Sequence, residues 1–474
     1  MQRTYIGDLG SKATESVLIK GWVDVRRDQG KMVFFDFRDM TGTIQGVVLP
    51  NRAEVIEVAK TCRPESVVAI EGIVNKRPER NVVVDKVNGD IELEVTNITI
   101  LNNAEPLPFE VNVDTKDVNE EVRLAHRYLD LRSQRMQRNI RSRDAVVNHI
   151  RNFLHDEKFI EVETPILTKS TPEGARDYVV PSRLYPGSFY ALPQSPQQYK
   201  QLLMSSGVER YFQIAKCMRD EDTRGDRQPE FTQLDMEMSF VEKEDVMALN
   251  EALIIDIVTK LFPEKKIQQI PFPRISYKES MEKYGNDRPD IREDKEDPNL
   301  LAFCWIVDFP FFERTDKSDN PQAEGEWTFT HNPFSRPIDE HMDMLMEKKD
   351  LAEILTSQYD VVLNGYEIGG GSTRNHTYEA LAKVFEILGH KTEEIEKNFG
   401  HMLHAFKTGT PPHGGIAWGL DRFLMLLLNE PNIREVIAFP KTGEGRDPMM
   451  NAPSEVSNKQ LDELHIVLKK IDNK

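Results

Sequence analysis

From Phe212 to Asp222 the chain reads FQIAKCMRDED, and from Gln228 to Asp235 it reads QPEFTQLD. The flanking residues Tyr211–Met218 and Thr232–Phe240 have the pattern of strands. An arginine and three acids therefore fall where one strand ends, just before a second strand begins. This stretch and its surroundings decide the fold class of the longer part of the chain.

The part of the chain around this stretch, residues 123–474, mixes helices and strands without a regular βαβ repeat. Helical periodicity covers Ile140–Glu157, and further strands are expected at Leu301–Asp308 and Asp360–Ile368. This spacing disfavours a doubly wound parallel sheet. The sequence contains neither a GxxxxGK[ST] loop nor a GxGxxG after a strand. A nucleotide would therefore be bound by another design.

Two more segments belong with the first. The chain reads FIEVETP at residues 159–165, a strand ended by proline after a long helix, and GGIAWGLDR at residues 414–422. In this order the three segments resemble motifs 1, 2 and 3 of the class II aminoacyl-tRNA synthetases. Further segments resemble the aspartyl family of that class rather than its lysyl relatives: TPEGARD at 171–177, QSPQQYK at 194–200 and GYEIGGGSTR at 365–374.

The resemblance runs over almost the whole chain and implies an α+β protein. An N-terminal OB-fold β-barrel would precede a class II catalytic domain, an antiparallel sheet flanked by helices, and the chain would form a homodimer across motif 1. The implied enzyme is a ligase that activates L-aspartate with ATP, releases pyrophosphate and transfers aspartate to the 3′ end of tRNA-Asp. A carboxylate is already a nucleophile, so this chemistry calls for arginines and a metal rather than a Ser-His pair.

By resemblance, Arg219 binds the α-phosphate and the substrate carboxylate, and Arg422 holds the far end of the triphosphate. Glu367 completes the implied catalytic set, and with Asp360 it would hold Mg2+, which prefers carboxylate oxygens. Glu221 would take the adenine amino group, and Phe231 would stack on the ring. The other implied ATP contacts are Asp220, Gln228, Gly419, Leu420 and Asp421.

For aspartate, the resemblance implies two cations at the β-carboxylate, Arg374 and Lys200. The ammonium group would be received by Glu173, Ser195, Gln197 and Asp235, with Glu173 on a loop that closes over the substrate. His331 matches a substrate-binding histidine of the family. The bacterial type commonly has a second histidine next, where this chain has Asn332.

Residues 1–105 alternate apolar and polar side chains in short runs separated by turns. Three strands, a helix and two strands are the order of an OB-fold, which binds oligonucleotides. We expect Phe35 and Phe37 to point inward and Phe34 to offer a stacking platform beside two arginines. The positions that match anticodon contacts of the family are Arg27, Phe34, Gln45, Arg77 and Glu92. The expected elements are strands 17–25, 32–38, 43–49, 66–74 and 91–101 and a helix at 52–61.

We expect residues 1–105 to form an anticodon-binding domain, 106–122 a hinge and 123–474 the catalytic domain with a C-terminal extension. The net charge of −18 argues against nucleic-acid binding only if its distribution is ignored. Seven arginines and one acid lie between Val122 and Arg143. Such a run is either a solvated helix face or a phosphate-binding stripe, and is weak evidence by itself.

Three cysteines lie far apart without a CxxC pair, which argues against a disulfide framework and a zinc site. The apolar run Phe423–Leu428 is too short to span a bilayer, and the N-terminus has no apolar signal core. No membrane partner and a cytoplasmic location are therefore expected.

Two departures from the bacterial pattern stand out. The usual inserted domain between motifs 2 and 3 is missing, since only a short acidic linker separates Arg292 from Leu301. In the family, the residue after an Arg-Arg-Asp run influences whether tRNA-Asn is also charged, and it is often Leu or His. This chain has Gln29 at that position.

Three alternatives remain. The nearest is an enzyme that charges both tRNA-Asp and tRNA-Asn. An asparaginyl enzyme is disfavoured, because a neutral amide would leave the charges of Arg374 and Lys200 uncompensated. A catalytically inactive OB-fold RNA-binding protein is disfavoured by the intact set Arg219, Glu221, Glu367 and Arg422.

Overall fold

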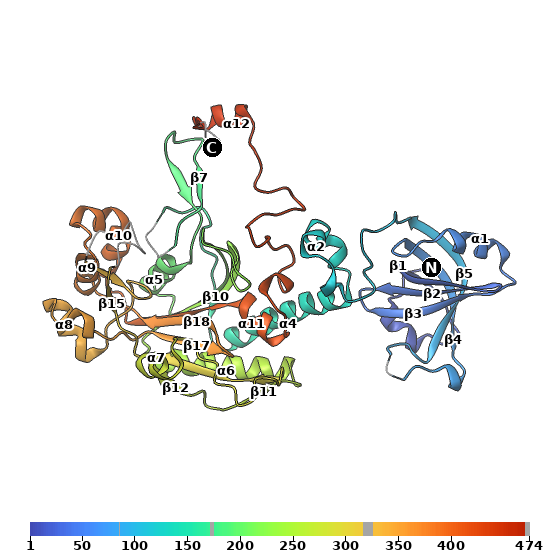
Figure 1. Cartoon of the computed structure of the whole chain (residues 1–474), viewed down its shortest axis with the longest axis horizontal. Coiled ribbons are helices and arrows are strands. Elements are labelled where there is room, and N and C mark those ends of the chain that lie inside the picture. The colour runs from blue at the N-terminus through green and yellow to red at the C-terminus, as the bar shows by residue number, and fades with distance from the viewer. Residues whose placement is uncertain (85, 171–174, 316–325, 470–474) are drawn as a thin grey trace. The chain divides into compact units, whose positions relative to one another are not determined.

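The computed structural model describes residues 1–84, 86–170, 175–315 and 326–469. The chain separates into two compact units (Figure 1). The first contains Met1–Arg123 with Arg132–Gln134, and the second contains Leu124–Leu131 with Arg135–Lys474. Each unit is described by itself below.

The first unit is a closed five-stranded barrel with the strand order β1-β2-β3-β5-β4, which confirms the predicted OB-fold. Helix α1 lies between β3 and β4 in the chain, where the sequence predicted a helix. The elements are η1 (Ile6–Ser11), β1 (Ser16–Gln29), β2 (Met32–Asp39), β3 (Gly42–Val48), α1 (Ala53–Thr61), β4 (Val67–Lys76), η2 (Glu79–Asn81), β5 (Ile91–Asn102) and η3 (Thr115–Asp117).

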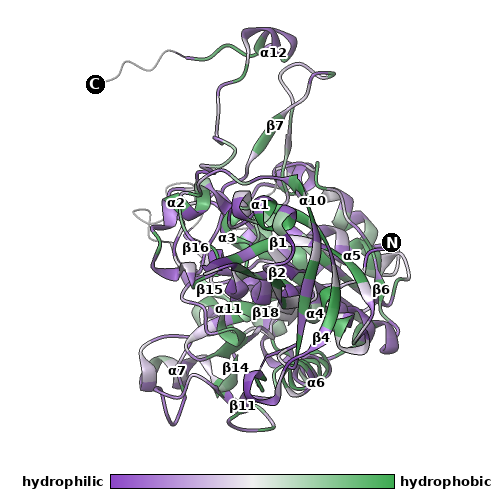
Figure 2. Cartoon of the chain, turned by 90° about the vertical axis from the view of Figure 1, so that its right-hand side faces the viewer, coloured by the Kyte–Doolittle hydropathy of each residue, from purple (hydrophilic) through white to green (hydrophobic). Residues whose placement is uncertain are grey.

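The barrel core follows the period of two that strands impose on their side chains. Val33, Phe35 and Phe37 are buried, and the rings of Phe35 and Phe37 stack with centroids 5.0 Å apart. Phe34 lies on the outer face and is only half-buried, as predicted. Figure 2 shows both hydrophobic and hydrophilic residues along these strands.

The second unit is built on an eight-stranded sheet with the order β12-β14-β17-β18-β19-β10-β9-β6. Six neighbouring strands are antiparallel, as expected, and the two short edge strands β12 and β6 are parallel to their neighbours. The strands are β6 (Ile160–Glu161), β9 (Arg210–Met218), β10 (Glu230–Ser239), β12 (Arg274–Ser276), β14 (Phe303–Val307), β17 (Tyr359–Leu363), β18 (Tyr366–Thr373) and β19 (His413–Gly419).

The single strand expected at Asp360–Ile368 is wrong, because this stretch is a hairpin. Strand β17 ends at Leu363 and β18 begins at Tyr366. The two residues between them, Asn364 and Gly365, have φ of 50° and 87°. An Asn-Gly pair with both φ values positive is typical of a tight hairpin turn, because glycine adopts this conformation without strain.

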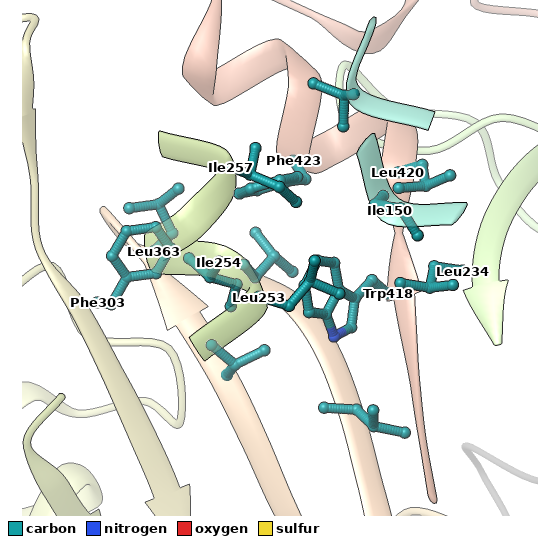
Figure 3. Close-up of a cluster of buried hydrophobic side chains, with 14 of the residues drawn as sticks. Ile150, Leu234, Leu253, Ile254, Ile257, Phe303, Leu363, Trp418, Leu420 and Phe423 are labelled. Atoms are coloured by element: carbon teal, nitrogen blue, oxygen red, sulfur yellow. The ribbon is translucent and has the colours of Figure 1, made fainter. Parts of the chain in front are cut away.

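One face of this sheet carries the main hydrophobic core. Helices α4 (Gln134–Asp156), α6 (Lys243–Leu261) and α11 (Leu420–Leu427) lie along it (Figure 1). Their apolar side chains meet those of the strands, with Ile254 and Phe423 packed near Trp418 and Leu234 (Figure 3). All four side chains are fully buried. The opposite face of the same strands is therefore left for polar side chains.

Shorter elements surround the sheet. The remaining helices are α2 (Glu120–Ala125), α3 (Arg127–Asp130), α5 (Gln197–Ser205), α7 (Tyr277–Tyr284), η4 (Asp339–His341), α8 (Met342–Glu347), η5 (Leu351–Glu353), α9 (Tyr378–Ile387), α10 (Thr392–Phe406), η6 (Ile433–Glu435) and α12 (Asn458–Glu463). Three two-stranded sheets pair β7 (Val179–Pro181) with β8 (Phe189–Ala191), β11 (Lys266–Ile267) with β13 (Leu300–Leu301), and β15 (Phe312–Arg314) with β16 (Trp327–Phe329).

Part of the arginine-rich run is used inside the fold, although Arg138 and Arg141 are exposed. Arg127 is buried and donates to Asp130 and to the carbonyl oxygens of Arg434, Ile437 and Ala438. Arg135 pairs with both Glu430 and Glu435 at 2.9 Å. These arginines therefore fasten α4 and its approach to the region that follows α11.

The three cysteines are buried, and none of them forms a disulfide in the described part of the chain. Among the described residues, no helix combines the length and apolar character needed to cross a bilayer.

Candidate active site

A cavity of about 560 Å³ opens on the polar face of the large sheet. Strand β10 shows how the sequence produces it, since side chains on a strand alternate between two faces. Leu234 and Met236 point into the hydrophobic core, whereas Gln233 and Asp235 line the cavity. The paired strands β10, β18 and β19 thus form its floor.

Most of the predicted site residues in this unit line the cavity, although they come from distant parts of the chain. They are Ser195, Gln197, Lys200, Arg219, Glu221, Gln228, Phe231, Asp235, His331, Asp360, Glu367, Arg374, Gly419, Asp421 and Arg422. The structure does not bring the side chains of Asp220 and Leu420 there: Leu420 is fully buried in the core, and Asp220 lies beside Arg176. Glu173 lies outside the described residues.

Four buried charges form a cluster at one end of the cavity. The ammonium group of Lys200 lies 2.7 Å from Oδ1 of Asp235 and 3.1 Å from Oε2 of Glu237. The guanidinium group of Arg374 donates to both carboxylate oxygens of Glu237, at 2.9 and 3.2 Å. Because all four side chains are almost completely buried, each charge depends on its partners rather than on water.

Glu237 was not among the predicted site residues. Burial alone would raise the pKa of Glu237, but the charges of Arg374 and Lys200 outweigh it and lower the pKa to about 2. At Asp235, burial raises the pKa despite the neighbouring Lys200. A signal for Glu237 was present, because Gln233, Asp235 and Glu237 are two residues apart and share one face of β10.

A glycine leaves room for this carboxylate. A Cβ atom on Gly415, in the neighbouring strand β19, would lie 2.1 Å from Oε2 of Glu237 and 2.1 Å from the carbonyl oxygen of Met236. Any other residue at this position would collide with both. Close packing over the charged cluster thus explains Gly415, the second glycine of the pair in motif 3.

Arg219 lies farther along the cavity, beyond the end of β9. Its guanidinium carbon is 5.2 Å from the centre of the Phe231 ring, so it lies over the aromatic face. The Nε atom of Arg219 is buried without a hydrogen-bond partner in the described part of the chain. The same holds for Nε2 of Gln228, whose Oε1 accepts from the backbone N–H of Lys441. Buried donors without partners are suited to a ligand.

Arg422 stands at the N-terminal end of α11. One guanidinium nitrogen donates to the carbonyl oxygen of Glu367, and another lies 3.0 Å from Oδ2 of Asp226. Asp226 lies in the loop between β9 and β10 and also lines the cavity. An anion from this loop therefore contacts the cation that was predicted to hold a triphosphate.

Two carboxylates, Asp360 and Glu367, lie close to His331. Burial, followed by the charge of Asp360, raises the pKa of Glu367. Burial lowers the pKa of His331, but its contact with Asp360 at 3.4 Å and the nearby Glu367 outweigh this and raise the pKa to about 9. Asn332 donates to Gln358, which in turn donates to Asp360. Asn332 thus supports the carboxylate indirectly.

In the barrel unit, four of the five predicted anticodon contacts, Arg27, Phe34, Gln45 and Glu92, are at least partly exposed. Arg27 is opposite Phe34 in the β1–β2 pairing, and its guanidinium lies 3.1 Å from Asp36. Asp36 is opposite Gln45 in the β2–β3 pairing. Arg77 directly follows β4 and lies 3.9 Å from Glu92 of β5, and its side chain is only 9% exposed. The five residues remain predicted RNA contacts.

Two family models match this chain. One, described as tRNA synthetases class II (D, K and N), matches residues 119–443. The other, described as an OB-fold nucleic acid binding domain, matches residues 17–101. Together they cover both compact units.

Relatives match nearly end to end. The chain is 41% identical to an aspartate–tRNA(Asp/Asn) ligase of Rubrobacter xylanophilus, over 97% of this chain and 95% of the relative. It is 38% identical to an aspartate–tRNA ligase of Staphylococcus carnosus, over 95% of this chain and 96% of the relative. The first alignment extends over 581 residues, more than the 474 of this chain, so the relative contains residues without a counterpart here.

Solved structures show the same fold. The asparaginyl-tRNA synthetase of Pyrococcus horikoshii, complexed with asparaginyl-adenylate, has a TM-score of 0.74 at 23% identity, with 93% of this chain and 98% of that chain covered. The aspartyl-tRNA synthetase of Entamoeba histolytica has a TM-score of 0.70 at 25% identity, with 93% of this chain and 91% of that chain covered.

Proposed function

Because the chain belongs to the class II tRNA synthetases of the aspartate, lysine and asparagine group, we propose that it is an aspartate–tRNA ligase. It activates L-aspartate with ATP and transfers the aspartyl group to tRNA. The observation that carries the choice of aspartate is the pair of buried cations, Lys200 and Arg374, exposed to the same cavity. A side-chain carboxylate can compensate both, whereas a neutral side chain cannot.

The first step needs alignment more than proton transfer. An α-carboxylate oxygen of aspartate attacks the α-phosphorus of ATP, and the bond to the leaving pyrophosphate breaks. Arg219 lies where one guanidinium could bind both the α-phosphate and the carboxylate, and its unpartnered Nε fits this role. Phe231 beneath it offers a surface for the adenine ring, and Glu221 and Gln228 offer polar contacts.

In the second step the 3′-terminal ribose hydroxyl of tRNA attacks the carbonyl carbon of aspartyl-adenylate. A new ester bond forms and AMP leaves with the electron pair of the mixed anhydride. The products of the whole reaction are aspartyl-tRNA, AMP and pyrophosphate.

Arg422 would hold the far end of the triphosphate in the first step, after exchanging Asp226 for a phosphate oxygen.

Mg2+ fits the residues present. Asp360, which is buried, and Glu367, which is exposed toward solvent, bring two carboxylates together. Desolvation, followed by the charge of Asp360, raises the pKa of Glu367, and a cation would offset both. No group of three or more His, Cys, Asp or Glu side chains among the described residues is arranged to hold a metal alone. Mg2+ commonly uses one or two carboxylates together with substrate phosphates. Bound there, it would neutralise phosphate charge.

The barrel would read the anticodon with Arg27, Phe34, Gln45, Arg77 and Glu92. Unstacked bases stack on outward aromatic rings, and arginines hold the backbone. For this division of labour we propose domain limits at 1–105, 106–122 and 123–474. Several relatives, including that of Rubrobacter xylanophilus, are aspartate–tRNA(Asp/Asn) ligases. Charging of tRNA-Asn as well is therefore the second candidate function.

A second copy of the chain is the proposed partner of the motif 1 region. Exposed apolar side chains gather along the chain before and within the β7–β8 hairpin, at Ile160, Ile166, Leu167, Val179 and Phe189. Clustered exposed apolar residues are typical of an interaction surface. We place this dimer in the cytoplasm, where the family's substrates are used.

The test is aminoacylation of transcribed tRNA-Asp and tRNA-Asn with labelled aspartate, ATP and Mg2+. Aspartyl ester on tRNA-Asp alone supports the discriminating form, and ester on both supports the second candidate. No ester on either tRNA would contradict the proposed ligase.

A further inference from the structure

Glu237 lies behind the cavity rather than in it. Its carboxylate is fully buried, is contacted by Lys200 and Arg374, and is not part of the cavity lining. Both cations do line the cavity. Glu237 is therefore placed to act on a ligand only through these two side chains.

The hydrogen bonds show what the cations have left for a ligand. An ammonium group has three hydrogens, and that of Lys200 faces Asp235 and Glu237, so one hydrogen remains. A guanidinium group has five N–H hydrogens. In Arg374, two of these hydrogens face Glu237, one faces Ser372 and one faces the carbonyl oxygen of Gly415. The fifth hydrogen, on the nitrogen that also donates to Ser372, remains for a ligand. Each cation thus keeps a single donor.

We infer that Glu237 is a specificity-determining positioning residue: it fixes Lys200 and Arg374 so that their two remaining donors form a receiver for one carboxylate. A carboxylate accepts at both oxygens and satisfies both donors. A carboxamide accepts at one oxygen only and turns its own NH2 group toward the other donor. This inference rests on the proposed function and deepens it, because it assigns the choice of aspartate over asparagine to a residue that does not touch the substrate.

The experiment is ATP–pyrophosphate exchange with the full chain, with L-aspartate and L-asparagine as separate substrates. The variant is Glu237→Gln, which keeps the size but removes the charge and replaces one accepting oxygen with an NH2 donor. The matched control is Glu251→Gln. Glu251 is also a buried glutamate, but it accepts from the backbone N–H of Phe272 and from the Trp305 indole, away from the cavity.

We expect Glu237→Gln to raise the KM for aspartate about 100-fold, because the two cations lose the charge that holds them in position. The preference for aspartate over asparagine should fall about 10-fold or more, while the KM for ATP stays within about 3-fold of the wild type. Glu237→Asp, which keeps the charge on a shorter side chain, should restore part of the preference. Glu251→Gln should leave both amino-acid constants unchanged.

Two results would overturn the inference. One is a folded Glu237→Gln variant with wild-type KM and wild-type preference. The other, decisive if Glu237→Gln does not fold, is a Glu237→Asp variant with an unaltered KM and an unaltered preference. Wild-type protein that shows no exchange with aspartate would instead contradict the proposed function itself, so the two failures are distinct.

Discussion

The outer face of the barrel and the cavity of the catalytic unit both carry charges of both signs, but they differ in their access to water. On the barrel, Arg27 pairs with Asp36 at 3.1 Å, and the arginine side chain is 43% exposed. In the cavity, Lys200 pairs with Asp235 and Arg374 pairs with Glu237 at similar distances, but these side chains are almost completely buried. Exposed pairs contribute little energy, whereas a buried charge that loses its partner is costly.

This difference suits two different ligands. An exposed face can exchange its ion pairs for RNA phosphates and bases with little loss, and it tolerates adjustment. The buried cluster is rigid and can distinguish a carboxylate from an amide. Substitutions on the barrel should therefore change the use of tRNA alone, and substitutions in the cavity should change amino-acid activation. The predictions below would break or sharpen this contrast.

The largest effect is expected for Arg219→Ala in the cavity. Loss of the guanidinium removes the charge that faces the α-phosphate, and ATP–pyrophosphate exchange should fall about 1000-fold. Circular dichroism should show an unaltered fold, because Arg219 Nε has no partner in the described part of the chain. Exchange above a tenth of the wild-type rate would mean a loss on the order of 1 kcal/mol in activation free energy. Such a small loss would show that Arg219 is not at the reacting phosphate.

Arg374→Lys should have the next largest effect. Lysine keeps the charge, but its three hydrogens cannot replace the five of the guanidinium, which face Glu237 twice, Ser372, the carbonyl oxygen of Gly415 and the substrate. We expect kcat/KM for aspartate to fall about 100-fold. The parallel measurement is the KM for ATP, which should hardly change. A variant with wild-type kcat/KM would contradict the two-donor receiver.

Gly415→Ala tests the packing of β19 over the charged cluster. The new Cβ would meet a carbonyl oxygen and a carboxylate oxygen, each at 2.1 Å, so strand β19 must shift. The free energy of unfolding of the catalytic unit should fall by about 2–3 kcal/mol, as measured in urea. Gly443→Ala is the control, because no described atom lies within 4 Å of its Cβ. Equal stability of the two variants would refute the packing argument.

Phe34→Ala tests the predicted stacking surface on the barrel. Loss of one stacking surface should raise the KM for tRNA about 10-fold, with exchange in the absence of tRNA unchanged. Tyr5→Ala provides a control, as Tyr5 is an exposed aromatic residue of the same unit outside the predicted contacts. A change in amino-acid activation on Phe34→Ala would break the proposed separation of the two regions.

The smallest effect, on the free energy of unfolding, is expected for Glu386→Gln on the surface of the catalytic unit. Hydrogen bonds from Lys348 and then Lys383 lower the pKa of Glu386. Because the folded pKa is below the unfolded one, the stabilisation is present above pH 4.5 and is lost as the pH falls. At pH 7 the substitution should cost under about 0.5 kcal/mol, since the pairs are exposed. Urea unfolding of the wild type and the variant at pH 7 and below pH 4 measures this difference in the free energy of unfolding. A larger destabilisation by the substitution at the lower pH would contradict the predicted pH dependence.

Much of the fold could be predicted because it depends on local patterns. The barrel strands and their inward phenylalanines follow from alternation alone, and the helix predicted at Ile140–Glu157 lies within α4 and its end. The hairpin at Asn364 and Gly365 was missed although its turn residues were visible. There, a continuous apolar run hid the turn chemistry, since both strands are largely buried.

The candidate site was less accessible to sequence reasoning. Most of its residues were named from the resemblance, and their convergence on one cavity is a property of the sheet order. Glu237 was missed because its role depends on cross-strand neighbours and on Arg374, which lies 137 positions away in the chain. The arginine run showed the same limit, because Arg135 finds Glu435 only after folding. Tertiary pairing cannot be read from local charge.

The central claim is that the buried cluster selects aspartate, and ATP–pyrophosphate exchange without tRNA tests it most directly. Purified protein with ATP and Mg2+ would receive aspartate, asparagine or lysine in parallel. The account predicts exchange with aspartate alone. Equal exchange with asparagine, or none with aspartate, would contradict it.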